Sequence, residues 1–193
     1  MDTYIVIPGD SLWRIAAKHQ VGLDELIVAN PQITNPSLIF PGQRIFIPKT
    51  AEFRAFEQEV VRLVNAERAR AGIRPPLTEN WEVSRVARFK SQDFIDNNYF
   101  AHNSPIYGTP FQMLRSFGIN FTAAAENIAH GQRTPAAVMN AWMNSPGHRA
   151  NILNPNFNQM GVGIARDNRG NLFWTQMFIT NPTVATTSFN TVG

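Results

Sequence analysis

The chain has 193 residues and a net charge of only +3, and it contains no cysteine. The lack of cysteine excludes a disulfide framework, a thiolate nucleophile and a zinc site built on cysteine. The small, dispersed positive charge favours polyanionic surroundings such as cell-wall polymers and gives no support for nucleic-acid binding. A single core needs roughly 100 to 150 residues, so this length favours two domains, one of them small.

No stretch of the sequence approaches 18 consecutive apolar residues, so no transmembrane segment is expected. The N-terminus also lacks the basic segment followed by an apolar stretch that marks a secretory signal. Two explanations stay open: a signal was removed, or the protein reaches its destination by a route other than conventional export.

The first 49 residues predict a small β-α-α-β module. Residues 3–7 are rich in β-branched and aromatic side chains and predict a strand, and residues 43–47 predict its partner after a Pro-rich loop. Between the strands, Asp10 or Ser11 can cap a first helix that Gly22 ends, and a second short helix follows.

Three motifs within this module carry a resemblance to a known family. They are Gly9-Asp10-Ser11-Leu12-Trp13, Asn30-Pro31 and Pro41-Gly42-Gln43-Arg44-Ile45, and through them residues 2–48 resemble a LysM domain. The resemblance implies binding of glycans that contain N-acetylglucosamine, chiefly peptidoglycan or chitin. Backbone groups in a groove between two loops would hold the acetamido group, and apolar side chains would cover the sugar. The glycan-binding residues expected on this basis are Gly9, Asp10, Ser11, Leu12, Leu38 and Ile39.

The letters Gly9-Asp10-Ser11-Leu12 also open the GDSL esterases, whose serine is a nucleophile. That mechanism needs a partner histidine, usually in a late Asp-x-x-His motif, within a much larger α/β domain. None of the four histidines of this chain (His19, His102, His130 and His148) follows an aspartate by three positions, which disfavours the esterase. A helix cap without any ligand role is the other alternative.

Residues 53–181 predict a second domain of helices and strands, after a short junction at 49–52. Apolar spacing predicts one helix from about Phe53 that Gly72 ends and another over residues 81–94. Thr134 as cap, followed by a proline in the first turn, predicts a third helix. Two strands, at 161–165 and 172–179, are expected on either side of a turn.

Two histidines and one glutamate in this domain form the smallest set that can hold a divalent metal or move a proton at neutral pH. His102 lies in an Ala-His-Asn-Ser-Pro run, Glu126 begins Glu-Asn-Ile-Ala, and His148 lies in Ser-Pro-Gly-His-Arg-Ala-Asn. The gaps between them are too long for one helical face. Only a folded domain could bring the three side chains together.

With Trp142 to Leu153 and Trp174-Thr175-Gln176-Met177-Phe178, these runs resemble the bacterial branch of the CAP superfamily, the cysteine-rich secretory, antigen 5 and pathogenesis-related 1 proteins. The resemblance extends from about Phe53 to Thr180. It implies an α-β-α sandwich, which puts the whole chain in the α+β class, and a cleft lined by His102, Glu126 and His148. Many eukaryotic members add a second glutamate at the end of a Trp-Tyr-x-Glu helix, where this chain has Asn144 and then Ser145.

Three roles stay open for His102, Glu126 and His148. Two neutral imidazoles and one carboxylate match the ligand count of an open metal site, so a divalent metal such as zinc is the expected cofactor. The same residues could be catalytic, as an acid/base group in a protease-like hydrolase directed to peptidoglycan. The third role is a buried hydrogen-bond network that only ties helices together.

Other polar residues rank lower as functional candidates. Ser104 and Ser145 each precede a proline and are expected in turns. His130 is expected to be solvated or locally paired, and residues 182–193 to form a loose polar tail. The arginines of the first helix in this domain are expected on a solvated face (Arg62, Arg68 and Arg70).

The sequence therefore predicts a cell-wall-associated or extracellular protein whose LysM domain delivers a CAP domain to peptidoglycan or a chitin-like glycan. The LysM segment also resembles that of spore-coat assembly proteins, which need no export. A spore-envelope location, with spore-coat or envelope proteins as partners, is the alternative. Ligand binding and hydrolysis both stay open for the CAP domain.

Overall fold

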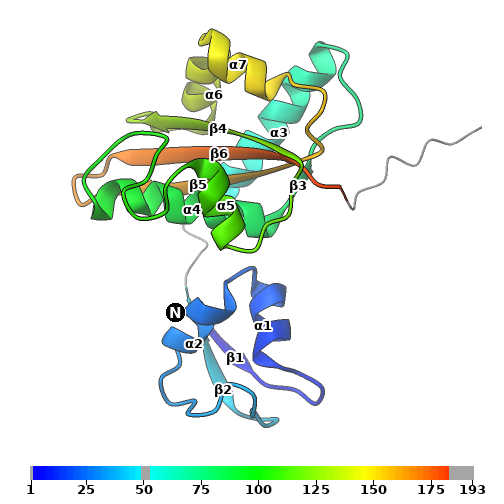
Figure 1. The fold of residues 1–193 in the computed structure, drawn as a ribbon. Helices are drawn as coiled ribbons and strands as arrows, with labels where there is room; N and C mark the ends of the chain where they lie inside the picture. Colours follow the sequence, from blue (N-terminus) through cyan, green and yellow to red (C-terminus); the bar gives the residue numbers. More distant parts are fainter. Residues whose placement is uncertain (1, 49–52, 183–193) are drawn as a thin grey trace, which may run out of the picture. The chain divides into compact units, whose positions relative to one another are not determined.

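The computed structural model describes residues 2–48 and 53–182 (Figure 1). The chain divides into two compact units, Met1–Ala55 and Phe56–Gly193, and each contains helices and strands. The expected α+β class is confirmed. The junction at 49–52 and the tail beyond residue 182 lie outside the described residues.

The first unit has the expected β-α-α-β order. Strand β1 (Asp2–Ile5) pairs antiparallel with β2 (Arg44–Ile47), and helices α1 (Leu12–His19) and α2 (Leu23–Val28) lie between them in sequence. Asn30 joins these elements from a fully buried position: its side-chain amide donates to the carbonyl oxygens of Leu26 at 2.8 Å and Phe46 at 2.7 Å. The Asn30-Pro31 motif thus has a structural role in linking the end of α2 to β2.

The start of α1 is confirmed and its expected end is wrong. Ser11 caps the helix, because its hydroxyl accepts the backbone N–H of Arg14 at 3.2 Å. At the other end Gln20, not Gly22, takes the left-handed conformation, with φ of 54°. The chain turns early because Val21 is buried and its N–H bonds to the carbonyl of Ala16 at 3.0 Å. Gly22 instead precedes α2 as its N-cap.

The second unit contains a four-stranded sheet in the order β3-β5-β6-β4. The two central strands are antiparallel and match the two strands predicted, while the two outer strands were not expected. Strand β3 pairs parallel with β5, and β4 pairs antiparallel with β6, which leaves β4 at an edge. The strands are β3 (Thr78–Glu79), β4 (Ala123–His130), β5 (Gln159–Arg166) and β6 (Leu172–Thr180).

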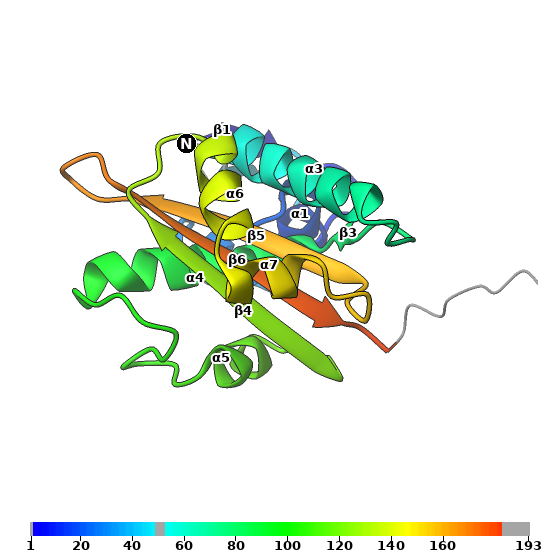
Figure 2. The ribbon, with the colours of Figure 1, turned by 90° about the horizontal axis from the view of Figure 1, so that it is seen from above.

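Helices cover both faces of this sheet (Figures 1 and 2), which is the sandwich implied by the resemblance. One face carries α4 (Trp81–Asp96) and α5 (Pro110–Ser116), and the other carries α3 (Arg54–Arg70), α6 (Pro135–Met143) and α7 (Pro146–Ile152). None of the helices in the described part of the chain is both long and apolar enough to cross a membrane.

Two glycines set the distance between α4 and the sheet. A Cβ placed on Gly163 would lie 2.0 Å from the backbone nitrogen of Arg88, and one on Gly161 would lie 2.2 Å from that of Ser84. Real side chains do not approach a backbone so closely. The helix that precedes the loop of His102 therefore lies directly on β5.

Arg68 corrects the expectation of a solvated arginine face on α3. Its side chain is buried, and Nη1 donates to the carbonyl oxygens of Ile152 at 2.9 Å and Asn154 at 2.7 Å. The guanidinium thus satisfies carbonyls at the end of α7 that the helix leaves unpaired. Arg62 and Arg70, in contrast, form exposed ion pairs within α3.

Candidate functional site

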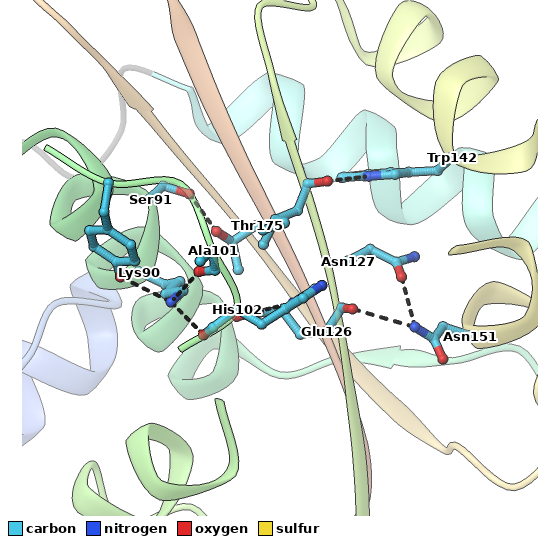
Figure 3. Close-up of polar contacts among 11 residues, drawn as sticks. Lys90, Ser91, Ala101, His102, Glu126, Asn127, Trp142, Asn151 and Thr175 are labelled. Atoms are coloured by element: carbon cyan, nitrogen blue, oxygen red, sulfur yellow. Dashed lines mark hydrogen bonds and ion pairs between the residues drawn. The ribbon is translucent and has the colours of Figure 1, made fainter. Parts of the chain in front are cut away.

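His102 and Glu126 are in direct contact. Nδ1 of His102 lies 2.7 Å from Oε1 of Glu126 (Figure 3). The glutamate side chain is 2% exposed and the histidine side chain 54%. The carboxylate is therefore held inside the protein while the imidazole faces solvent. With Nδ1–H donated to the carboxylate, Nε2 becomes the nitrogen that can accept a proton or bind a ligand.

The contact shifts the ionisation of both groups. The hydrogen bond to Glu126 raises the pKa of His102 above 6.5, against the opposing effect of partial burial. Burial raises the pKa of Glu126 above 4.5, and this increase is opposed by the hydrogen bond from His102 and the charge of Lys90. Oε2 of Glu126 is buried and has no hydrogen-bond partner among the described residues. The pKa values of both members of the pair are therefore raised.

Glu126 comes from the edge strand β4, where successive side chains point to opposite faces. The neighbouring residue, Asn127, therefore faces the side of α7. Its amide nitrogen donates to the carbonyl oxygen of His148 at 3.1 Å and to Gln176 Oε1 at 3.0 Å. Its oxygen accepts from Asn151 at 2.8 Å (Figure 3). Glu126 and Asn127, on opposite faces of β4, thus bind the loop of His102 and the helix of His148, respectively.

His148 lies on α7 and is half-buried. Burial lowers its pKa below 6.5, and the positive charge of His102 lowers it further. The two histidines are therefore close enough to affect each other, and their pKa values move in opposite directions. Near pH 6.5 the site favours one protonated and one neutral imidazole.

The described residues contain no group of three or more His, Cys, Asp or Glu side chains arranged to hold a metal ion. Glu126 is already bonded to Nδ1 of His102, so the trio is not preformed as the three-ligand set expected from the sequence. The carboxylate on Nδ1 instead orients the ring of His102 and leaves Nε2 as the nitrogen that can accept a proton or a ligand.

The lower-ranked residues have structural contacts. Ser104 forms a turn, with its hydroxyl accepting the N–H groups of Ile106 and Tyr107, as expected. His130 packs against the ring of Phe173 at a centroid distance of 4.7 Å. Ser145, at the position of the glutamate that is missing here, is the N-cap residue of α7.

The glycan-binding residues expected in the LysM domain divide into two groups. Leu12 is 2% exposed and belongs to the core, so the expectation that its side chain covers a sugar is wrong. The face of α1 that carries it must pack inward to bury this small domain's core. Ile39 packs against the same core, and the carboxylate of Asp10 accepts from Tyr4 Oη at 2.8 Å and Ile7 N–H at 2.9 Å, which closes a turn.

Three expected positions stay accessible: Gly9 and Ser11 in the first loop, and Leu38 in the second. Leu38 and Phe40 line a pocket of about 270 Å³ together with Thr34, Asn35 and Gln43. Phe40 is well exposed and was not expected as a site residue. An aromatic residue in a Pro-rich loop was the signal that could have indicated it.

Comparison with known proteins establishes the family. The model of the cysteine-rich secretory protein family (CAP) matches residues 61–178, so the chain belongs to this family. The LysM domain model matches residues 4–48, and the chain therefore joins a LysM domain to a CAP domain.

Several of the matched relatives are bacterial. YkwD of Bacillus subtilis (strain 168) is 54% identical over 125 residues, which is 65% of this chain and 47% of YkwD. The spore coat assembly protein ExsA of Bacillus cereus is 48% identical over 48 residues, 25% of this chain and 8% of ExsA. The crystal structure of an extracellular protein with an SCP domain from Bacillus anthracis has a TM-score of 0.62 at 33% identity, covering 73% of this chain and 47% of that one. The chain spans about half the length of the B. subtilis relative.

Proposed function

We propose that this protein is associated with the cell wall or spore envelope, that its LysM domain binds N-acetylglucosamine glycans of peptidoglycan, and that the cleft of its CAP domain binds a divalent metal or a small ligand. The observation that carries the proposal for the cleft is the 2.7 Å contact between His102 and Glu126. A buried carboxylate behind a solvent-facing imidazole is how proteins present a histidine nitrogen to a metal.

A divalent ion such as zinc would be held by Nε2 of His102 and by the imidazole of His148, with water or a small ligand as its remaining partners. The ion would supply a Lewis acid in the cleft. Glu126 would act from behind His102 by fixing the orientation of its ring. Because the pKa of His102 is raised, metal and proton compete for this imidazole at neutral pH.

Zinc titration of the full chain tests this half of the proposal. The double variant His102→Ala, His148→Ala is expected to lose at least about tenfold in zinc affinity, since both nitrogens proposed as ligands are removed. Wild-type affinity should also fall between about pH 7.5 and pH 5.5, because both imidazoles must be neutral to act as ligands. The control is His130→Ala, which lies outside the pair. Equal zinc binding by wild type and double variant would overturn the metal assignment.

The same pair supports a second candidate function, a peptidoglycan-targeted hydrolase of protease-like type. Nε2 of His102, with Glu126 behind it, could take a proton from an attacking water at pH values above the raised pKa of His102. Peptidoglycan or a protein substrate would be incubated with the full chain and with its Glu126→Gln variant. Release of product by both at the same rate, or by neither, counts against hydrolysis at this site.

The glycan half of the proposal predicts that residues 1–50 sediment with insoluble peptidoglycan and that residues 51–193 do not. The LysM domain is a compact unit with its own buried core, so it should act alone. In the full chain, Phe40→Ala should weaken binding severalfold, because Phe40 lines the exposed pocket. Val28→Ala removes an even more exposed apolar side chain outside that pocket and is the control. Sedimentation of the C-terminal fragment alone would show that the anchor is misassigned.

The match to ExsA supports the spore envelope as one destination, with spore-coat or envelope proteins as partners. The proposed binding of peptidoglycan applies to the cell wall and to the spore envelope alike.

A further inference from the structure

Lys90, on α4, is fully buried at 0% exposure. Its ammonium donates to three oxygens: Tyr99 Oη at 2.9 Å, the carbonyl of Ala101 at 3.0 Å and the carbonyl of His102 at 2.7 Å (Figure 3). These contacts use all three of its N–H groups. Two of the three acceptors are main-chain oxygens of His102 and of the residue before it.

A second tie holds the other end of the same loop. Tyr99 Oη, which accepts from Lys90, donates in turn to Asp93 on α4. Asp93 Oδ2 also accepts the hydroxyl of Ser104 at 2.7 Å. The loop that carries His102 is therefore fastened to α4 both at the histidine and beyond it, and α4 itself lies against β5 at the two glycines.

Burying an ammonium costs desolvation free energy, and neutral hydrogen-bond donors would be enough to hold a loop in place. The surroundings of Lys90 explain why a cation is tolerated. Burial lowers the pKa of Lys90, and the nearby negative charges of Glu126 and Asp93 oppose that decrease. Lys90 thus holds the backbone that positions His102, and its charge lies near the carboxylate that His102 contacts.

We propose that Lys90 is a positioning residue of the cleft: its ammonium holds the main chain at Ala101 and His102 so that the imidazole stays bonded to Glu126 through Nδ1, with Nε2 left for a ligand. The expected effect of Lys90 on ligand binding rests on the proposed function of the cleft. Its effect on the position of His102 does not. Lys90 lies outside the sequence motifs that carry the family resemblance, and it touches no ligand itself.

The test compares Lys90→Met with Arg68→Met in the full chain. Both variants remove a buried cation that donates to loop carbonyls, but only Lys90 holds those of His102. Nitrogen-15 spectra of the imidazoles, recorded where His102 is neutral and assigned with His102→Ala, report which ring nitrogen carries the proton. Wild type and Arg68→Met should show His102 protonated on Nδ1. Lys90→Met should shift it towards the Nε2-protonated form, and zinc affinity should fall about tenfold.

Retention of the Nδ1-protonated form in folded Lys90→Met, or its equal loss in Arg68→Met, would overturn the proposal. If wild type binds no zinc, the metal function of the cleft fails, while the tautomer comparison still decides the role of Lys90. Should Lys90→Met not fold, Lys90→Gln makes the same comparison. Its amide keeps a polar group in the site but is too short to reach all three acceptors.

Discussion

Gly163→Ala is expected to destabilise the CAP domain by about 3 kcal/mol or more. The new Cβ would lie 2.0 Å from the backbone nitrogen of Arg88, and a backbone atom cannot move aside as a side-chain end can. Helix α4 would have to lift from β5, which would also displace Lys90 and the loop of His102. Denaturant melts followed by tryptophan fluorescence, with Trp142 and Trp174 buried in this domain, give the free energy of unfolding.

The matched control is Gly147→Ala in α7. A Cβ on Gly147 meets nothing within 4 Å, so this change should leave stability unaltered or raise it by up to about 1 kcal/mol. The LysM domain of Gly163→Ala should still bind peptidoglycan, because its core is separate from that of the CAP domain. Unfolding of Gly163→Ala at the wild-type denaturant midpoint would contradict the close contact between α4 and β5.

Glu126→Gln is expected to lower zinc affinity by about 10- to 100-fold and to move the pKa of His102 from above 6.5 to below it. The amide keeps the side-chain volume and can still accept from Nδ1–H, but it removes the charge. The hydrogen bond to the carboxylate is the largest cause of the raised pKa of His102, and the burial that remains lowers it. Proton NMR titration of the imidazole resonances measures this change directly.

The dependence of stability on pH should reverse with that substitution. In the wild type, His102 contributes stability that is fully present below pH 6.5 and is lost as the pH rises through its raised folded-state pKa. In Glu126→Gln the folded-state pKa lies below 6.5, so the His102 contribution is lost as the pH falls through that window. Glu59→Gln, which removes a carboxylate from an exposed ion pair, should show no reversal. A stability loss of about 1 to 3 kcal/mol at neutral pH with unchanged zinc affinity would instead identify a structural network.

The elements that sequence analysis predicted well carry strong local signals. Thr134 accepts the N–H of Ala137 at 3.2 Å and begins α6 just before a proline. The β5-β6 hairpin follows from two apolar runs and a turn whose Asp167 accepts the backbone N–H groups of Arg169 and Asn171. In each case a few neighbouring residues determine the conformation, so the element can be predicted from the local sequence alone.

The strand and helix that hold the site were not predicted as such. Strand β4 begins Ala-Ala-Ala-Glu-Asn and contains one β-branched residue, so its conformation comes from pairing with β6 rather than from local preference. Helix α7 has only 7 residues and opens with proline and glycine, which read as a turn. Lys90 was missed because a lysine in a helix normally faces water, and its burial depends on carbonyls of the following loop.

The side chains of Glu126 and Asn127 point to opposite faces of an edge strand. This arrangement limits which insertions or deletions the cleft tolerates and how it can be grafted onto another protein. A one-residue insertion or deletion in β4 ahead of this pair would turn every later side chain over. The carboxylate would then face α7, and the amide would face the loop of His102. Grafting His102, Glu126 and His148 onto another scaffold would not reproduce the cleft unless the strand's register against β6 were grafted with them. The site therefore depends on the whole paired strand, because the pairing of β4 with β6 determines which way each side chain points.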